Sequence, residues 1–340
     1  MKPPPGRRGA GQRAPKTQNH EKRGPIKAKQ EANELRNKTK ITKTRGIHVI
    51  KNKDGTIKYQ MTCYRIFAVF IIGEISITSG LIRRARKFEF VLCLMTSSFR
   101  VYSIIGNRME GNTMLHHKQY EYDGDDLARF IVLNKIKNQK KVLGNLRYQT
   151  DAVTEAIDTL GKYEATLHQE NIVGSSLLGL EGSASKVYFP QIFNNVNWKG
   201  RKPRIKNDYI NSTLDIGYTM LFNIVDSLLQ LYGFDVYQGV YHKEFYMRKS
   251  LVCDLMEPMR PLIDYKVRKA INLKQCKQED FKVYYNSQWT LIPQKIPAYI
   301  GFLMEEILDN KEEMFLFIQS YYRSFMKGRP VEEYRMFNLQ

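Results

Sequence analysis

The hydrophobic pattern of the chain changes near residue 123, and this change constrains the fold more than any other feature of the sequence. Before it, β-branched and aromatic residues gather in stretches of about four to eight residues, which is typical of strands. After Asp123-Gly124-Asp125-Asp126, apolar residues recur about every 3.6 positions, as they do in amphipathic helices. We therefore predict an α+β protein in which a small N-terminal β-rich domain (residues 46–122) precedes a larger α-helical domain (residues 123–340).

Individual elements are predicted from local signals. Ile47–Ile50 and Ile57–Tyr59 lie on either side of Asp54-Gly55, a dipeptide that favours a β-hairpin. Ser212-Thr213-Leu214-Asp215 fits a capping box, which predicts the start of a helix that ends at Gly233. The remaining predictions are strands within Arg65–Ile72, Phe88–Met95 and Phe99–Ile105, a short helix at Thr78–Arg86, and one or two helices over Ile296–Phe325.

Positive charge is concentrated at the N-terminus. Residues 1–45 contain 14 Lys and Arg against 3 Asp and Glu, a net charge of +11, and almost no large apolar side chains. Such a segment cannot bury enough surface to fold, so we predict a disordered basic arm that contacts phosphates or serves only as a solubilising tail. The whole chain carries +20, which leaves +9 (20 − 11) for the other residues and favours a polyanionic partner.

Two classes of protein are disfavoured. The longest apolar run, Ile66–Gly73, is far shorter than the roughly 20 residues of a membrane-spanning helix, and the N-terminus has no apolar signal-peptide core. The cysteines form no C-x-x-C pair, which argues against a disulfide framework or a structural zinc site. We expect a cytoplasmic protein with four reduced thiols, at Cys63, Cys93, Cys253 and Cys276.

Ionisable residues are densest, within an apolar pattern, between positions 251 and 264. On a helix, three carboxylates of this segment fall on the side opposite its apolar residues: Asp254, Glu257 and Asp264. Neighbouring carboxylates repel each other, so we expect Arg260, a metal ion or both to compensate them, unless the acidic face is simply solvated. Pro258 has no amide donor, so the helix should kink or begin again there.

Two polar residues elsewhere are further candidates. Glu181 lies in an apolar, small-residue stretch, where a buried carboxylate needs either a metal or a Lys or Arg partner. His242 follows Gly239 in a short loop and, taken alone, is typical of a surface histidine. If Glu181, His242 and Glu257 converge, two carboxylates and one imidazole would suit octahedral Mg²⁺ or Mn²⁺, or in principle a three-ligand zinc site.

These segments, in this order, resemble the motifs of the integrase subunit of CRISPR adaptation, the family that inserts new spacers into a CRISPR array. Glu181-Gly182-Ser183-Ala184 with Tyr188-Phe189 is similar to the first motif, and Gly239-Val240-Tyr241-His242-Lys243 is similar to the histidine motif. The segment Ser250–Pro261 is similar to the third and most specific motif, and its Met-Glu-Pro form looks most like members found beside single-protein effectors. Asn211 and Gly217-Tyr218 also fit the family's intervening helix.

The resemblance covers roughly residues 45–330 and implies a chemistry. It implies that Glu181, His242 and Glu257 bind Mg²⁺ or Mn²⁺, and that Asp254 supports them as a fourth catalytic residue. The reaction would be a transesterification in which the 3′-hydroxyl ends of short DNA fragments attack phosphodiesters at the repeat borders. The resemblance also implies a prokaryotic protein that forms a homodimer through its β-domain and assembles into a tetramer or with a small partner subunit.

The chain departs from this family in two places. A basic arm as long as residues 1–45 is unusual, so its role is unassigned, and Met259 stands where an aromatic residue is common. Candidate DNA contacts are the basic residues near the motifs, although such runs are also common on solvated surfaces. They are Lys199, Arg201, Lys202 and Arg204 beside Trp198, and Arg248 and Lys249 before the acidic segment.

Other functions stay open at this point. A metal-dependent, structure-specific DNA nuclease would use the same ligands with water in place of the 3′-hydroxyl. A non-catalytic nucleic-acid-binding scaffold would depend on charge alone. A protein of anionic membranes is disfavoured because the basic arm has no apolar face.

Overall fold

The fold was analysed in a computed structural model of the chain. It describes residues 40–44, 47–51, 57–66, 68–73, 76–96, 101–106, 112–168, 172–203, 205–243, 245–283 and 288–339. The chain divides into two compact units, with the boundary between Gln60 and Met61, and each unit is described separately below. Residues 1–39 of the predicted basic arm, and Arg204, lie outside the described residues. No helix in the described ranges combines the length and apolarity that crossing a bilayer requires.

The first described strands form a small sheet in the order β1-β2-β3. They are β1 (Lys40–Thr44), β2 (Ile47–Lys51) and β3 (Ile57–Thr62). β1 pairs antiparallel with β2, with Lys40 opposite Lys51. β2 and β3 are neighbours in the sheet, as the hairpin prediction requires, and the Asp54-Gly55 turn itself lies outside the described residues.

The larger unit begins with a second three-stranded sheet, in the order β4-β5-β6. Its strands are β4 (Ala68–Ile72), β5 (Val91–Met95) and β6 (Val101–Ile105). β4 and β5 run parallel and are connected through the predicted short helix, α2 (Ser79–Lys87), whose first turn is capped by the Thr78 hydroxyl. β5 is buried along its whole length, and its Val91, Cys93 and Met95 side chains join the core formed by the helices.

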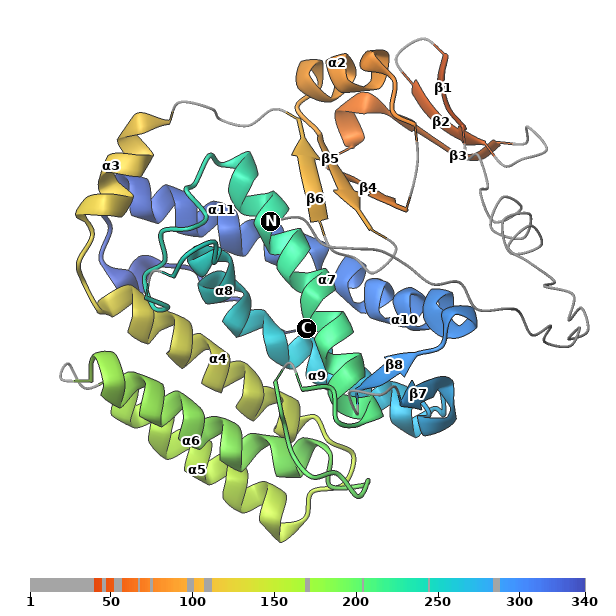
Figure 1. Ribbon diagram of the computed structural model, residues 1–340. Coiled ribbons are helices and arrows are strands. Elements are labelled where there is room, and N and C mark those ends of the chain that lie inside the picture. Colours follow the sequence, from red (N-terminus) through yellow and green to blue (C-terminus); the bar gives the residue numbers. More distant parts are fainter. Residues whose placement is uncertain are drawn as a thin grey trace, which may run out of the picture. The chain divides into compact units, whose positions relative to one another are not determined.

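The rest of the larger unit is helical, apart from the short β7 (Phe281–Val283) and β8 (Trp289–Leu291). In chain order its helices are α3 (Thr113–Glu121), α4 (Asp126–Gly144), α5 (Asp151–Leu167), α6 (Gly174–Ile192), α7 (Tyr209–Leu231), α8 (Ser250–Met256), α9 (Arg260–Asn272), α10 (Ile296–Asp309) and α11 (Lys311–Lys327). α4, α5 and α6 pack on one another, and α7 contacts α8, α9, α10 and α11 (Figure 1). The α+β class predicted from the sequence is confirmed.

The start of α7 differs from the prediction. The helix begins at Tyr209 with Asp208 as its cap, because an Asp208 carboxylate oxygen accepts the Asn211 amide at 2.7 Å. The predicted capping box at Ser212 is therefore wrong: Ser212 lies inside the helix, and its hydroxyl donates to the Trp289 carbonyl. Aspartate caps a helix as well as serine does, so the earlier residue begins it. The predicted end is confirmed, since Gly233 follows Leu231 with a left-handed φ of 76°.

The acidic segment is broken at its prolines, as expected. α8 ends at Met256, a single 3₁₀ turn spans Glu257–Met259, and α9 starts at Arg260. The Pro258 carbonyl accepts a hydrogen bond from the Asn138 side chain of α4 at 2.9 Å. This hydrogen bond connects α4 to the 3₁₀ turn that contains Glu257.

Residues near the C-terminal end of the described chain also attach to α4. The Asn134 amide donates to the Phe337 carbonyl and accepts the Phe337 backbone N–H, both at 2.8 Å. Asn138 donates to the same carbonyl at 2.9 Å. These bonds satisfy polar groups that are almost fully buried, and they fix the rotation of α4 about its axis.

Candidate metal centre

The centre of the site is a buried lysine between two glutamates. The Lys135 ammonium of α4 lies 2.7 Å from a Glu257 carboxylate oxygen and also forms an ion pair with Glu181 of α6. Lys135 and Glu257 are buried, and the Glu181 side chain is only 22% exposed. The structure therefore brings Glu181 and Glu257 together, and the Lys or Arg partner considered for Glu181 is present as Lys135.

Charge on this cluster is fixed by mutual attraction. Burial alone would raise the pKa of Glu257, but Arg260 and Lys135 outweigh it and lower that pKa to about 2. Burial alone would lower the pKa of Lys135, but Glu257 and Glu181 outweigh it and hold that pKa above its usual value. The Arg260 Nε lies 2.8 Å from Glu257 without the alignment of a hydrogen bond. Glu257, Lys135 and Arg260 are therefore ionised at neutral pH.

Asp254 organises the loop that carries the histidine. This carboxylate is fully buried and accepts three consecutive backbone amides, those of Val240 at 2.7 Å, Tyr241 at 3.0 Å and His242 at 2.9 Å. A side chain at Gly239 could not fit, because a Cβ there would lie 2.8 Å from the same carboxylate and 2.7 Å from the Ser250 Cβ. The acidic face of the segment is thus a buried anchor and not a solvated surface.

The same carboxylate sets the orientation of the His242 ring. The His242 Nδ1 lies 2.6 Å from an Asp254 oxygen, so the neutral ring carries its proton on Nδ1 and leaves Nε2 to accept a proton or bind a metal. Tyr241 links this loop to the glutamates, because its hydroxyl donates to Glu181 at 3.4 Å. Burial, together with the charges of Glu181 and Glu257, raises the Tyr241 pKa and keeps the hydroxyl protonated.

The donor set suits a hard divalent cation, but its present arrangement does not hold one. Carboxylate oxygens and a neutral imidazole are ligands of Mg²⁺ and Mn²⁺. Within the described ranges, however, no group of three His, Cys, Asp or Glu side chains is placed to share one ion. The reason lies in the geometry above: both glutamates are bound to the Lys135 ammonium. The ligand role of Glu181, His242 and Glu257 stays a prediction.

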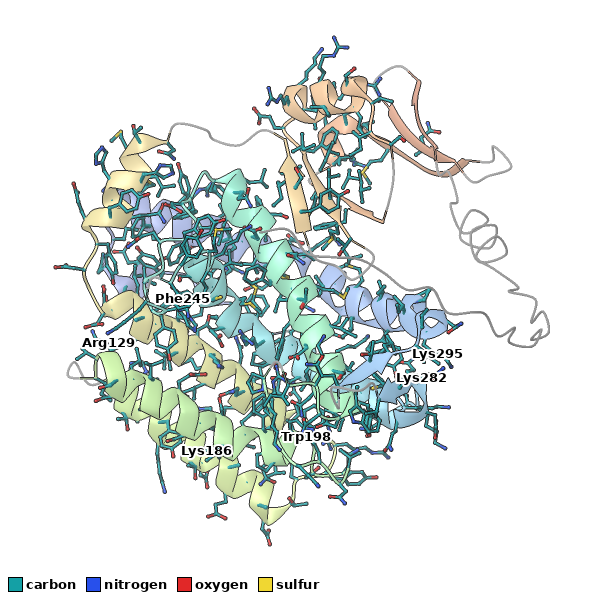
Figure 2. The ribbon with its side chains drawn as sticks, in the orientation of Figure 1. Arg129, Lys186, Trp198, Phe245, Lys282 and Lys295 are labelled. Atoms are coloured by element: carbon teal, nitrogen blue, oxygen red, sulfur yellow. The ribbon has the colours of Figure 1, made fainter. Side chains whose placement is uncertain are left out.

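The glutamates open onto a cavity of about 960 Å³ that is lined by five basic and four acidic side chains. Its basic residues are Lys135, Lys186, Arg201, Lys206 and Arg260. Lys186 lies on α6, and Trp198 lies in the loop that follows this helix (Figure 2). The Tyr218 ring lies between two guanidinium groups, with its centroid 5.2 Å from Arg201 and 4.8 Å from Arg260. Guanidinium and ammonium groups of this kind bind phosphate oxygens, although Lys135, Arg201 and Arg260 also pair with carboxylates of the lining.

Asp264 lies at the same cavity and is the third carboxylate of the acidic segment. It is buried, and the Tyr218 hydroxyl donates to it. Burial raises the pKa of Asp264 to about 6, although Tyr218, Arg201 and Lys135 act in the opposite direction. This carboxylate therefore titrates closer to neutrality than an ordinary aspartate.

The basic residues chosen as DNA contacts fall into two groups. Lys199 and Lys202 are exposed. Arg201 and Lys249 instead pair with Asp215 and Asp226, each at 2.6 Å. Arg248 is half-buried, and its guanidinium donates to the Lys243 carbonyl at 3.0 Å. DNA binding by these residues stays a prediction, and the exposed lysines are the better candidates.

Sequence reasoning missed Lys135, Tyr218 and Tyr241 as members of the site. A signal for Lys135 was present in α4: Asn134, Lys135, Asn138 and Gln139 recur at helical spacing within an apolar stretch, and all four are buried. Buried polar groups on one helix face need partners, so this stripe marks a face that packs against other polar groups.

Solved structures share this fold. One, described as a partial Cas6-RT-Cas1–Cas2 complex, matches with a TM-score of 0.71 over 88% of this chain and 96% of its own, at 22% identity. Another, a casposase bound to an integration product, matches with a TM-score of 0.63 over 88% of this chain and 93% of its own, at 18% identity. The chain therefore has the fold that these Cas1-containing and casposase structures share.

The sequence identifies the family among proteins with this fold. The family described as CRISPR associated protein Cas1 matches residues 35–300, and the chain belongs to it. A relative from Thermodesulfovibrio yellowstonii, named CRISPR-associated endonuclease Cas1 1, is 29% identical over 225 residues, which are 63% of this chain and 71% of the relative. The resemblance to the CRISPR adaptation family noted in the sequence is confirmed.

Proposed function

We propose that the chain is a divalent-metal-dependent DNA integrase and endonuclease of CRISPR adaptation. It joins the 3′-hydroxyl ends of short DNA fragments to the repeat borders of a CRISPR array. One observation carries the proposal: an imidazole oriented by a buried aspartate, Asp254, is connected through Tyr241 to a pair of glutamates at a cavity that basic side chains also line. The names of the relatives, CRISPR-associated endonucleases, support the same chemistry.

Each residue has a role in this proposal. Glu181, Glu257 and the His242 Nε2 would hold Mg²⁺ or Mn²⁺, which when bound polarises the scissile phosphate. Asp254 keeps His242 in the tautomer that leaves Nε2 available. Arg260, which pairs with Glu257 and also lines the cavity, would add positive charge beside a bound phosphate. One phosphodiester forms as another breaks, so the joining step needs no nucleotide hydrolysis.

The proposed partners are DNA, a second copy of the chain and a small adaptation subunit. A homodimer would form through the β-rich region and assemble further into a tetramer or with the small subunit. Two of the structural neighbours are a Cas6-RT-Cas1–Cas2 complex and a casposase bound to an integration product, which supports this kind of assembly. The setting would be the prokaryotic cytoplasm.

A joining assay tests the proposal. The full chain is incubated with supercoiled repeat-containing DNA, a short duplex with 3′-hydroxyl ends and Mn²⁺. We expect joined products from the wild-type chain and none from Glu181→Gln, His242→Ala or Glu257→Gln, with DNA binding largely kept. Glu305→Gln, at a surface carboxylate 65% exposed, is the matched control and should join normally.

Three results would contradict the proposal. Nicks without joined products would indicate a nuclease in which water is the nucleophile. Products that persist in a chelator would exclude a divalent metal. Normal joining by any one of the three variants would remove that residue from the mechanism.

A further inference from the structure

The feature that carries this inference is the Lys135 ammonium. Its nitrogen contacts both glutamates that the proposed function assigns to the metal, at 2.7 Å from Glu257 and in an ion pair with Glu181. Lys135 is 7% exposed, so bulk water does not screen these contacts well. The Arg260 guanidinium is already committed to the other Glu257 oxygen. The lysine is therefore the only cation that joins the two carboxylates within the described residues.

Helix α4 holds this lysine in place. The residue before it, Asn134, is bonded to Phe337 on both sides of its amide, and Asn138 one turn later is bonded to Pro258 and Phe337. Because the backbone on either side is fixed, the ammonium can leave the glutamates only through rotations of its own side chain. The adjoining cavity, which Lys135 also lines, provides the space for that movement.

A divalent ion and the ammonium cannot occupy this position together. Mg²⁺ binds carboxylate oxygens at about 2.0–2.1 Å, closer than an ammonium nitrogen approaches, so the two cations would compete for the same oxygens. Their positive charges would also repel each other strongly in a buried setting. Without either cation, the two carboxylates would face each other with only Arg260, which pairs with Glu257, to compensate their charge, which is costly. A cation between the two carboxylates is therefore favoured, and there is room for only one.

Resting on the proposed function, we propose that Lys135 is a built-in counter-cation that occupies the metal position in the metal-free chain and is displaced into the cavity when a divalent ion binds. The ammonium keeps the glutamates together before metal arrives. It also weakens metal binding, because each ion that binds must first break two ion pairs, one of them buried and the other half-buried. Lys135 is thus a positioning residue that sets the metal affinity of the site.

The test measures metal binding directly and does not depend on joining activity. Mn²⁺ is titrated into the full-length wild-type chain and into Lys135→Met by calorimetry, and the melting temperature is recorded with and without Mn²⁺. We expect Lys135→Met to bind Mn²⁺ more tightly, on the order of tenfold, which lies within the usual range of coupling between sites. The metal-free variant should melt at a lower temperature and gain more from Mn²⁺ than the wild type does.

Two further variants make the result specific. Lys135→Gln is also neutral but remains polar, and its Mn²⁺ affinity should rise as that of Lys135→Met does. It replaces the methionine variant in the test if that variant does not fold. Lys266→Met removes another lysine that contacts two glutamates, Glu305 and Glu306, away from the site, and it should leave Mn²⁺ affinity unchanged.

The outcomes separate this inference from the proposed function. Unchanged or weaker Mn²⁺ binding by both neutral variants, with normal binding and joining by the wild type, overturns the inference alone. Failure of every chain to bind Mn²⁺ or Mg²⁺ overturns the inference together with the metal dependence of the proposed function.

Discussion

At the residue scale, the site depends on how closely backbone can approach Asp254. Three successive amides converge on this carboxylate, and Gly239 passes so near that no side chain fits between. The hydrogen bonds fix the backbone of Tyr241 and His242 before either side chain meets a ligand. The glycine, which binds nothing itself, is therefore part of what positions the imidazole.

We predict that Gly239→Ala loses most of its joining activity. The added methyl would push the loop away from Asp254, and a displacement of about 1 Å in a catalytic group costs on the order of a hundredfold in rate. Folding should weaken by about 1–3 kcal/mol, as is usual for an overpacked position. Joining rates and melting temperatures check this, with Gly161→Ala as the control because a Cβ there meets no atom within 4 Å. Equal activity of both variants would contradict the argument.

A second prediction concerns Asp264 and pH. Its pKa is about 6 in the folded chain, against 3.8 ordinarily, so between these values the folded chain keeps a proton that the unfolded chain has lost. The contribution of Asp264 to the free energy of unfolding is therefore fully present below pH 4. It falls by about 3 kcal/mol as the pH rises through 6. Asparagine cannot titrate, so the stability of Asp264→Asn relative to wild type should rise by up to that amount from pH 4 to pH 8. Urea unfolding of both chains across this range measures it, and a pH-independent difference would disprove it.

At the element scale, α7 packs directly against α9 through Gly217. A Cβ at this position would lie 2.5 Å from the Ile263 Cγ2 and 3.2 Å from the Leu303 Cδ2 of α10. Ile263 is fully buried and β-branched, so it has little freedom to move aside. The missing side chain is what lets three helices meet beside Tyr218 and Asp264.

Replacing Gly217 with alanine should therefore destabilise the chain. Overpacking costs about 1–3 kcal/mol, which outweighs the roughly 1 kcal/mol that alanine gains over glycine in a helix. Ile263→Ala should restore space, so the double variant should lose less stability than the sum of the two single losses. Denaturant unfolding of the four chains measures this coupling, with Gly301→Ala as a control that meets no neighbour. Additive losses would show that the two residues do not share the contact.

The elements show how far sequence reasoning reaches. Strand and helix positions follow from hydrophobic period, and the break at Pro258 follows from its missing donor. The predicted start of α7 was wrong because Asp208 and Ser212 are both acceptable caps. The tertiary contact of Ser212 with Trp289 decides between them. The role of Lys135 could not be predicted, since its partners lie 46 and 122 residues away along the chain. Local pattern identifies buried polar residues but not which of them meet.

At the scale of the whole molecule, the basic residues that give the net charge of +20 have two different roles. Lys135, Arg201, Lys249 and Arg260 neutralise carboxylates within the fold. Exposed lysines such as Lys199 and Lys202 remain available to an external polyanion. Net charge alone therefore overstates the number of residues that can contact phosphates.

This division predicts distinct effects of mutation. Lys199→Gln with Lys202→Gln should reduce the slope of log affinity for DNA against log salt by about 0.9 for each lost phosphate contact, with an unchanged melting temperature. Arg201→Gln should instead lower stability, because it leaves the mostly buried Asp215 without its partner. Binding isotherms at several salt concentrations, together with melting curves, separate the two effects. Lys162→Gln, at an exposed lysine of α5, is the control. If this control lowered the salt slope as much as the double variant does, a local DNA interface at Lys199 and Lys202 would be contradicted.

The bonds between α4 and Phe337 have a consequence for the order of events during synthesis. The helix that carries Lys135 is made early, but its orientation depends on amide partners made about two hundred residues later. In a nascent chain still held by the ribosome, Asn134 cannot form these hydrogen bonds until residue 337 has left the exit tunnel. A chain synthesised only as far as α11 would therefore lack this anchor for α4, and with it the fixed position of Lys135 between the two glutamates.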